Sequence, residues 1–306
     1  MDDILKEIHC TDAKDFISKF SYGGEYFHLR NENFIFRGEP SDQYSLIPSS
    51  LREKNRTNIE RIIRNFIPEF SKDIFDLSIE YHQITSEYIL LSMFFRECDR
   101  NGLYIPDITD LRSLAAVKIP LQEELDNIEK WLPLNYIELA GLAQHYGIYT
   151  RLLDWSFDFN VALYFAVSGY MLNKTDNHPK NIVIWALNTE IVVNNKFDMT
   201  GLKITVPKYN SNPNLCAQKG VFTLWQITNT GRDFEMHTNR APLDQLIKKN
   251  SELIITNTKN GNPLYKIYIP VENYHELKTY LETSGYDSAR LFPGYGGAAK
   301  YILNNL

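Results

Sequence analysis

The segment from Leu142 to Val167, LAQHYGIYTRLLDWSFDFNVALYFAV, constrains the fold more than any other part of the chain. Its spacing predicts a helix that ends in QHYG, a short strand over Thr150–Leu153, and a second helix that begins near Asp158 and is apolar on nearly every turn. Ionisable side chains rarely lie among core-forming residues unless they are paired or used. The sequence therefore predicts that Arg151 and Asp154 either form a structural ion pair or contribute to a functional site.

The composition is typical of a soluble globular protein. The 306 residues are 43% hydrophobic and 23% charged, enough for one large domain or two small ones. The formal net charge of −6 argues against generalised nucleic-acid binding, which needs a basic surface. Cys10, Cys98 and Cys216 are far apart and have no CxxC spacing, so we expect neither a disulfide framework nor a metal site.

The N-terminal sequence MDDILKEIHC is acidic and predicts a helix, unlike a signal peptide. The sequence also has no apolar run that approaches the length needed to span a bilayer. From these two observations we expect a cytoplasmic protein without a membrane partner.

The first 140 residues predict a mainly helical region around one strand. Apolar residues from Asn58 to Glu97 recur at helical spacing, and no Pro-, Gly- or Ser-rich linker separates this region from its flanks. We therefore expect residues 58–144 to form a helical insertion, or cap, after the first strand. The elements expected in this half are helices over Asp12–Phe20, Asn58–Glu97, Leu111–Trp131 and Ile137–Gln144, and a strand over Phe34–Phe36.

The second half predicts short strands rich in β-branched and aromatic residues. Helices early in the chain and strands late indicate an α+β domain with a mixed or antiparallel sheet, and we expect residues 1–306 to form one domain. The expected loops are Asn188–Ser211 and Ile227–Ala241, and the expected closing helices are Glu272–Thr283 and Ala298–Leu306. The expected strands are Ile182–Leu187, Ile204–Val206, Val221–Gln226, Leu253–Ile255 and Tyr265–Ile269.

A second block, Phe34–Arg52, reads FIFRGEPSDQYSLIPSSLR and places Phe36-Arg37-Gly38 at the end of an apolar strand. Together with the AQHYG and TRLLDW sequences, this block resembles the FRG domain, a bacterial family named after Phe-Arg-Gly. The sequences AQKGVF at Ala217–Phe222 and LFPGYGGAAKYI from Leu291 resemble later motifs of that family. The resemblance covers most of the chain in order, and it implies a single FRG domain over residues 1–306.

The chemistry of the first block centres on Arg37 and Gly38. The planar guanidinium of arginine suits bidentate capture of phosphate or carboxylate, and a glycine allows a ligand or another stretch of backbone to come close. The two blocks also resemble the first two motifs of ADP-ribosyltransferases: a strand ending in Arg-Gly, then a Thr-bearing strand followed by an A-x-x-F helix. That resemblance implies a sheet like the ADP-ribosyltransferase fold, with NAD as substrate, and it implies that Arg37 and Gly38 hold the pyrophosphate or ribose.

The second block would supply the rest of the NAD site that this resemblance implies. Thr150 is expected near the nicotinamide ribose, with Trp155 or Tyr164 as an aromatic wall. Arg151 is expected to line the same pocket.

The third motif of that fold carries a glutamate, whereas this chain has Gln218 at the matching position. A neutral amide can hydrogen-bond a ribose hydroxyl, but it cannot stabilise developing positive charge as a carboxylate does. Either Asp154 supplies the carboxylate from the neighbouring strand, or the site binds a nucleotide without turning it over. His145 is a candidate general acid or base, because the reference pKa of histidine is about 6.5, and it is equally typical of a histidine bonded to a backbone carbonyl.

Two functions follow as expectations. The first is an NAD-dependent enzyme that transfers ADP-ribose to a macromolecular acceptor or hydrolyses NAD, as a bacterial effector, toxin or phage-defence protein. The second is a catalytically inactive nucleotide-binding or protein-interaction module. The enzyme requires four polar residues to converge on one pocket lined by aromatic rings, namely Arg37, Arg151, Asp154 and Gln218. In the inactive module, Arg37, Arg151 and Asp154 instead pair with one another and are closed from solvent.

Overall fold

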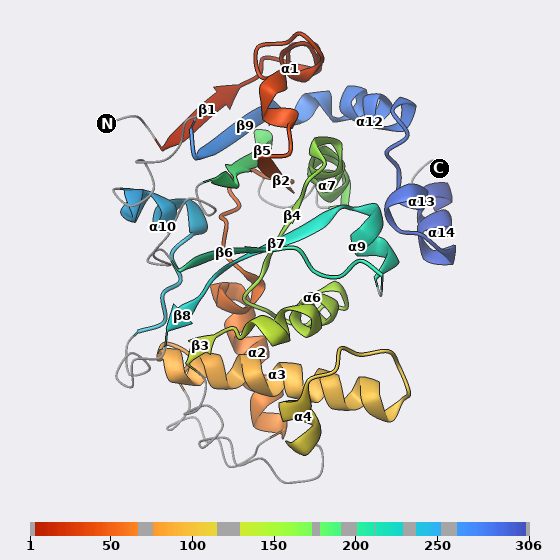
Figure 1. The fold of residues 1–306 in the computed structure, drawn as a ribbon. Helices are drawn as coiled ribbons and strands as arrows, with labels where there is room; N and C mark the ends of the chain where they lie inside the picture. The colour runs from red at the N-terminus through yellow and green to blue at the C-terminus, as the bar shows by residue number, and fades with distance from the viewer. Residues whose placement is uncertain are drawn as a thin grey trace.

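A seven-stranded mixed sheet lies at the centre of the structure, in the order β1-β9-β5-β2-β4-β7-β6 (Figure 1). One edge pair, β1 with β9, is parallel, and the other neighbouring strands are antiparallel. The expected α+β class with a mixed sheet is therefore confirmed. The strands of this sheet are β1 (Leu5–His9), β2 (Phe34–Glu39), β4 (Leu153–Ser156), β5 (Asn181–Asn188), β6 (Leu202–Thr205), β7 (Gly220–Trp225) and β9 (Leu264–Pro270), and β3 (Lys130–Trp131) pairs separately with β8 (Ile227–Thr228).

This computed structural model describes residues 4–66, 76–114, 129–172, 178–190, 201–210, 212–228, 237–251 and 262–303. The strand expected over Leu253–Ile255 lies outside the described residues, as do residues 115–128 of the helix expected over Leu111–Trp131. None of the helices within the described ranges is long and apolar enough to cross a membrane.

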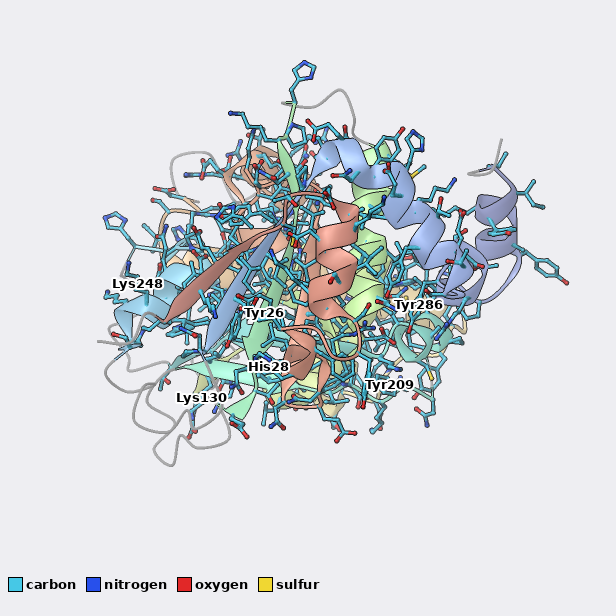
Figure 2. All side chains as sticks on the ribbon, turned by 90° about the horizontal axis from the view of Figure 1, so that it is seen from above. Tyr26, His28, Lys130, Tyr209, Lys248 and Tyr286 are labelled. Atoms are coloured by element: carbon cyan, nitrogen blue, oxygen red, sulfur yellow. The ribbon has the colours of Figure 1, made fainter. Side chains whose placement is uncertain are left out.

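Both faces of the sheet are covered, because alternate residues of the apolar strand β5 enter two different hydrophobic clusters. The covering helices are α1 (Ala13–Phe20), α7 (Phe159–Leu172) and α12 (Tyr274–Thr283) on one face and α10 (Leu243–Lys249) on the other. Under α1 and α7, the rings of Phe16, Phe20 and Phe159 lie with their centroids 5.1 to 5.7 Å apart. Figure 2, seen from above, shows β1 and β9 side by side next to α1.

A second layer of helices packs against the β4–β7 part of the sheet (Figure 1). Its helices are α2 (Glu53–Phe66), α3 (Glu80–Arg100), α4 (Thr109–Leu114) and α6 (Ile137–His145). Phe95 and Trp131 from this layer share one hydrophobic cluster with Leu152 and Phe222 from the sheet region. Burial of this cluster stabilises both parts together, because its apolar surface is contributed by both. The layer follows β2, which is the second strand of the chain and not the first.

Several local predictions were wrong. Leu5–His9 form β1 instead of a helix, because they pair in register with β9 near the other end of the chain. Such distant pairing decides between helix and strand and is not visible in the segment itself. β8 lies in the expected loop Ile227–Ala241, whereas β6 overlaps the strand expected over Ile204–Val206. The helix expected over Leu111–Trp131 overlaps α4 at its first residues, and its last residues, Lys130–Trp131, instead form β3, which pairs with β8.

Both strands that carry expected site residues are displaced from their predicted positions. β2 continues through Arg37 and Gly38 to Glu39, because the backbone of these residues pairs with β5. β4 begins at Leu153, later than expected, so Arg151 lies in the connection that precedes the strand.

Gly38 allows β2 and α7 to approach closely. A Cβ atom at this position would overlap the backbone carbonyl oxygen of Ala162 and would lie 2.8 Å from the backbone nitrogen of Ala166. Backbone atoms inside a helix cannot move aside as the end of a flexible side chain can. The glycine of the Phe-Arg-Gly sequence therefore serves the packing of α7 on the sheet.

We predict that Gly38→Ala lowers the free energy of unfolding by about 1–3 kcal/mol, the usual cost of overpacking. Gly296→Ala is the matched control, because nothing lies within 4 Å of the added Cβ and the residue belongs to the helix α14 (Tyr295–Leu303). Alanine is favoured over glycine within a helix by up to about 1 kcal/mol, so the control should keep or gain stability. Urea denaturation of both variants measures the difference, and equal changes would contradict the packing role.

Candidate functional site

The candidate site is a cavity of about 330 Å³ between β2, β4, β7, the end of α6 and α9 (Pro213–Ala217), which we call the motif cavity. Stretches of chain that are far apart in the sequence converge on it. Most of the residues expected at a site line its wall, namely Arg37, Gly38, His145, Asp154, Trp155 and Gln218.

The motif cavity opens where β2 and β4 separate. The register joins these two strands at one residue pair, Phe36 with Ser156. Beyond that pair the Arg37 side chain bridges the strands: its Nη1 donates to the backbone oxygen of Asp154 at 2.8 Å, and its Nε donates to Glu39 Oε1 at 2.6 Å. A side chain therefore takes the place of ladder hydrogen bonds at this point of the sheet.

The guanidinium of Arg37 is held in its charged form. Its side chain is 14% exposed, and this burial would lower its pKa, but the charges of Glu39 and Asp154 outweigh it and raise the pKa. Arg52 lies close enough that burial and then the charge of Arg37 lower its pKa. Its Nε donates to the backbone oxygen of Ile47 at 2.8 Å. Two guanidinium groups that repel each other are stabilised by an anionic ligand.

Asp154 presents its carboxylate to the motif cavity. Its side chain is 61% exposed, and its Oδ2 lies 4.0 Å from Nη1 of Arg37. Desolvation raises the pKa of Asp154 above its ordinary value. The charge of Arg37 and a hydrogen bond from Gln144 oppose the shift. A carboxylate with a perturbed pKa in a cavity is characteristic of functional sites.

His145 and Gln144 are positioned from the end of α6. The amide nitrogen of Asn214 lies 2.8 Å from His145 Nε2, and because an amide nitrogen only donates, Nε2 accepts this hydrogen bond. The Thr150 hydroxyl donates to Gln144 Oε1. Thr150 is buried and does not line the motif cavity, so it acts on the cavity through Gln144.

Gln218 is fixed in a turn between α9 and β7. Its side-chain nitrogen donates to the backbone oxygen of Leu291 at 3.0 Å, and its backbone oxygen accepts from the Ser156 hydroxyl at 2.7 Å. Lys219, with φ of 46°, then turns the chain into β7. Asp158 holds this turn, because it accepts from Lys219 Nζ at 3.0 Å and from the hydroxyl of Tyr286 at 2.9 Å.

The aromatic wall differs from the expected one. The indole nitrogen of Trp155 donates to Thr223 Oγ1 at 2.8 Å, which directs the ring into the core on the other side of β4. Tyr164 packs against Phe165 outside the motif cavity. The rings that do line it belong to Phe36, Phe165, Phe222 and Phe292. Phe165 could have been found from the A-x-x-F spacing, since Ala162 and Phe165 lie on the same helix face and both line the cavity.

Arg151 belongs to a different part of the molecule. It is 3% exposed, and it pairs with Glu80 at 2.6 Å and Glu87 at 2.9 Å, both on α3, and not with Asp154. Burial would lower the pKa of Arg151, but the two carboxylates raise it. Glu87 also accepts from the Trp131 indole nitrogen at 2.6 Å. This network ties α3 to the segment before β4.

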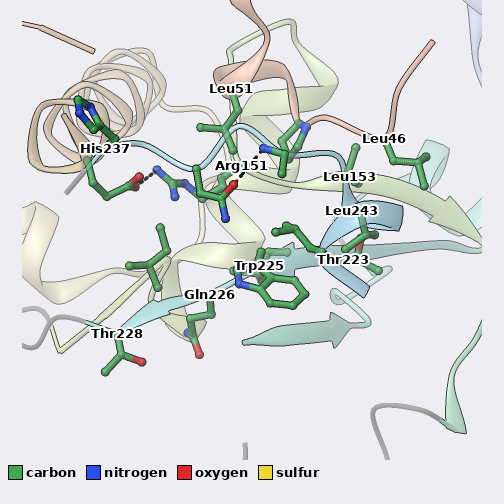
Figure 3. A pocket seen from close by; sticks show the side chains of 17 residues that line it. Leu46, Leu51, Arg151, Leu153, Thr223, Trp225, Gln226, Thr228, His237 and Leu243 are labelled. Carbon is green, nitrogen blue, oxygen red and sulfur yellow. Dashed lines mark hydrogen bonds and ion pairs between the residues drawn. The ribbon is translucent and has the colours of Figure 1, made fainter. Parts of the chain in front are cut away.

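Arg151 lines a separate cavity of about 360 Å³, shown in Figure 3 beside Leu51, Leu153 and Trp225. Leu153 faces this cavity and Asp154 faces the motif cavity, as the alternation of side chains along β4 requires. Among the described residues, no group of three or more His, Cys, Asp or Glu could hold a metal ion.

Comparison with protein families gives a match over part of the chain. The model of the FRG domain family matches residues 108–175, a range that includes His145, Asp154 and Trp155 of the motif cavity. The resemblance to the FRG domain is thereby confirmed over the second sequence block. No curated protein and no solved structure matches the chain, so no structural relative supports the likeness to the ADP-ribosyltransferase fold.

We predict that Glu87→Ala lowers the free energy of unfolding by about 3–5 kcal/mol, because it leaves Arg151 as a poorly paired buried charge and removes the acceptor of Trp131. Glu97→Ala is the control on the same helix: its side chain is 64% exposed and pairs with Arg100. Exposed ion pairs contribute about 0–1 kcal/mol. Chemical denaturation at neutral pH compares the two, and a similar small loss in both would contradict a structural role for the network.

Proposed function

We propose that the motif cavity binds NAD and that the protein acts on the bond between nicotinamide and ribose, either transferring ADP-ribose to a macromolecular acceptor or hydrolysing NAD. The observation that carries the proposal is the meeting of the Arg37 guanidinium and the Asp154 carboxylate in one cavity with aromatic walls. The range matched by the FRG domain family ends before Gln218, so the role of that residue rests on geometry alone. Such an activity suits a bacterial effector, toxin or phage-defence protein.

Each polar residue has a role in this proposal. Arg37, with Arg52 nearby, provides positive charge for the pyrophosphate through charge-assisted hydrogen bonds. Asp154 stabilises the cationic ribose that develops as nicotinamide leaves with the bonding electron pair. Gln218, held by the Leu291 carbonyl, hydrogen-bonds a ribose hydroxyl. His145 accepts the proton of the attacking water or acceptor group at Nε2, which exchanges its hydrogen bond from Asn214 for that proton.

A catalytically inactive binding or interaction module is the second candidate. It is favoured by the contacts of the Arg37 guanidinium, which pairs with Glu39 on its own strand and donates to the Asp154 backbone, so that it joins β2 to β4. The two candidates differ in what NAD does in the motif cavity: the enzyme binds it and releases nicotinamide, whereas the inactive module does not release nicotinamide.

We predict that Arg37→Ala abolishes NAD binding, whereas Asp154→Asn spares binding and lowers turnover. Arg37 acts on charge present in the ground state, where hydrogen bonds to charged groups contribute about 1.5–3 kcal/mol. Asp154 acts on charge that appears in the transition state, and such an interaction alters rate more than affinity. Calorimetric titration with NAD and an assay of free nicotinamide measure the two effects.

Two further variants serve as controls for this experiment. Arg37→Lys keeps a positive charge for buried Glu39 but loses the planar fork, so it should fold and still bind NAD weakly. Arg61→Ala removes an exposed arginine of α2 and should change neither affinity nor turnover. A wild type that neither binds NAD nor releases nicotinamide would contradict the enzyme and favour the inactive module.

We also predict the pH dependence of kcat/KM. Asp154 must be ionised to stabilise a cationic ribose, so activity falls as the pH drops through its pKa. Because desolvation raises that pKa, the acid limb should lie above the ordinary value for aspartate of about 3.9. An acid limb that persists unchanged in the residual activity of Asp154→Asn would assign it to another group.

A further inference from the structure

A second cavity of about 450 Å³ adjoins the motif cavity, and we call it the aromatic cavity. It lies between α3, the segment after α3, and α6. Gly141, Asn212, Leu215 and Phe222 line both cavities, so the two cavities meet at these residues. The two cavities thus form neighbouring compartments beside Asp154.

We propose that the aromatic cavity holds the adenine ring of the NAD whose nicotinamide ribose and phosphates occupy the motif cavity. This inference rests on the proposed function and names a part of its substrate site. Ligand cavities in proteins span roughly 300–1,000 Å³, so the motif cavity, at about 330 Å³, lies at the lower end of that range. A ligand with two ring systems joined by a pyrophosphate needs a second compartment.

Two adjacent residues with aromatic rings, His145 and Tyr146, line the two cavities. The His145 ring, on the wall of the motif cavity, lies 5.1 Å from the ring of Tyr146 in an edge-on arrangement. Tyr146 lines the aromatic cavity and stacks against Phe94 at 6.4 Å with an interplanar angle of 29°. A planar heterocycle that enters the aromatic cavity can stack against Tyr146 in the orientation that Phe94 has.

Large aromatic side chains at the rim of the aromatic cavity are unusually exposed to solvent. Tyr146 is 69% exposed and Tyr104 is 67% exposed, although both line the cavity. A flat ring bound in the aromatic cavity would cover part of this surface, and any base can stack on an aromatic side chain because every base has a π-face. The net charge of −6 disfavours a nucleic acid as the source of that base, which leaves a free nucleotide.

The test compares ligands with and without adenine. Calorimetric titrations use NAD, ADP-ribose and nicotinamide mononucleotide with the wild type, Tyr146→Ala and Tyr146→Phe. We expect Tyr146→Ala to weaken NAD and ADP-ribose about tenfold while leaving nicotinamide mononucleotide unchanged, and Tyr146→Phe to bind all three like the wild type. Tyr22→Ala removes a tyrosine that is 91% exposed at a distant site and should change nothing.

Each outcome separates this inference from the proposed function. If the wild type releases nicotinamide and Tyr146→Ala binds all three ligands normally, or loses them equally, the adenine site is overturned and the proposed function stands. If Tyr146→Ala lowers only the rate of transfer to a protein acceptor, the aromatic cavity holds a side chain of that acceptor and the inference is again overturned. If the wild type does not bind NAD, titration with adenosine monophosphate decides: binding that Tyr146→Ala weakens supports an adenine site, and no binding overturns it.

Discussion

The separation of β2 from β4 is the constraint on which the site depends. After the pair of Phe36 with Ser156, the two backbones no longer meet, and the Arg37 side chain reaches the Asp154 carbonyl across the gap. Buried backbone polar groups need partners, so a side chain must replace the missing ladder bonds. Arginine can do so because its planar end serves Glu39 and Asp154 together. The motif cavity lies beside this single bridge because no ladder closes the sheet there.

Two arginines on either side of β4 have different environments. Arg151 is closed from solvent by Glu80 and Glu87, and it fixes α3 against the segment before the strand. The helical layer held in this way includes α6, whose end brings His145 to the motif cavity. Arg37 is the arginine that shares a cavity with Asp154. Removal of Arg151 should therefore act on the site only by loosening the layer that positions it.

Features that depend on local sequence pattern were predicted correctly, whereas contacts between residues far apart in the chain were missed. The end of α6 and the start of α7 were expected correctly, because apolar spacing and the glycine turn act within the segment. Four residues were expected to converge: Arg37, Asp154 and Gln218 line the motif cavity, whereas the fourth, Arg151, does not. The partners of Arg151 lie on α3, more than sixty residues earlier in the chain, and no spacing in the sequence indicates that contact. Phe292 reaches the cavity from the C-terminal region for the same reason.

The most direct measurement follows the arginine side chains themselves. The Nε–H resonances of Arg37 and Arg151 in a ¹⁵N-labelled protein can be recorded by NMR during titration with NAD. The account predicts a saturable shift of the Arg37 resonance, since its guanidinium lines the motif cavity, and an unchanged Arg151 resonance, since that group is enclosed by two carboxylates. A shift confined to Arg151, or no shift of Arg37 at saturating NAD, would contradict the assignment of the motif cavity as the NAD site.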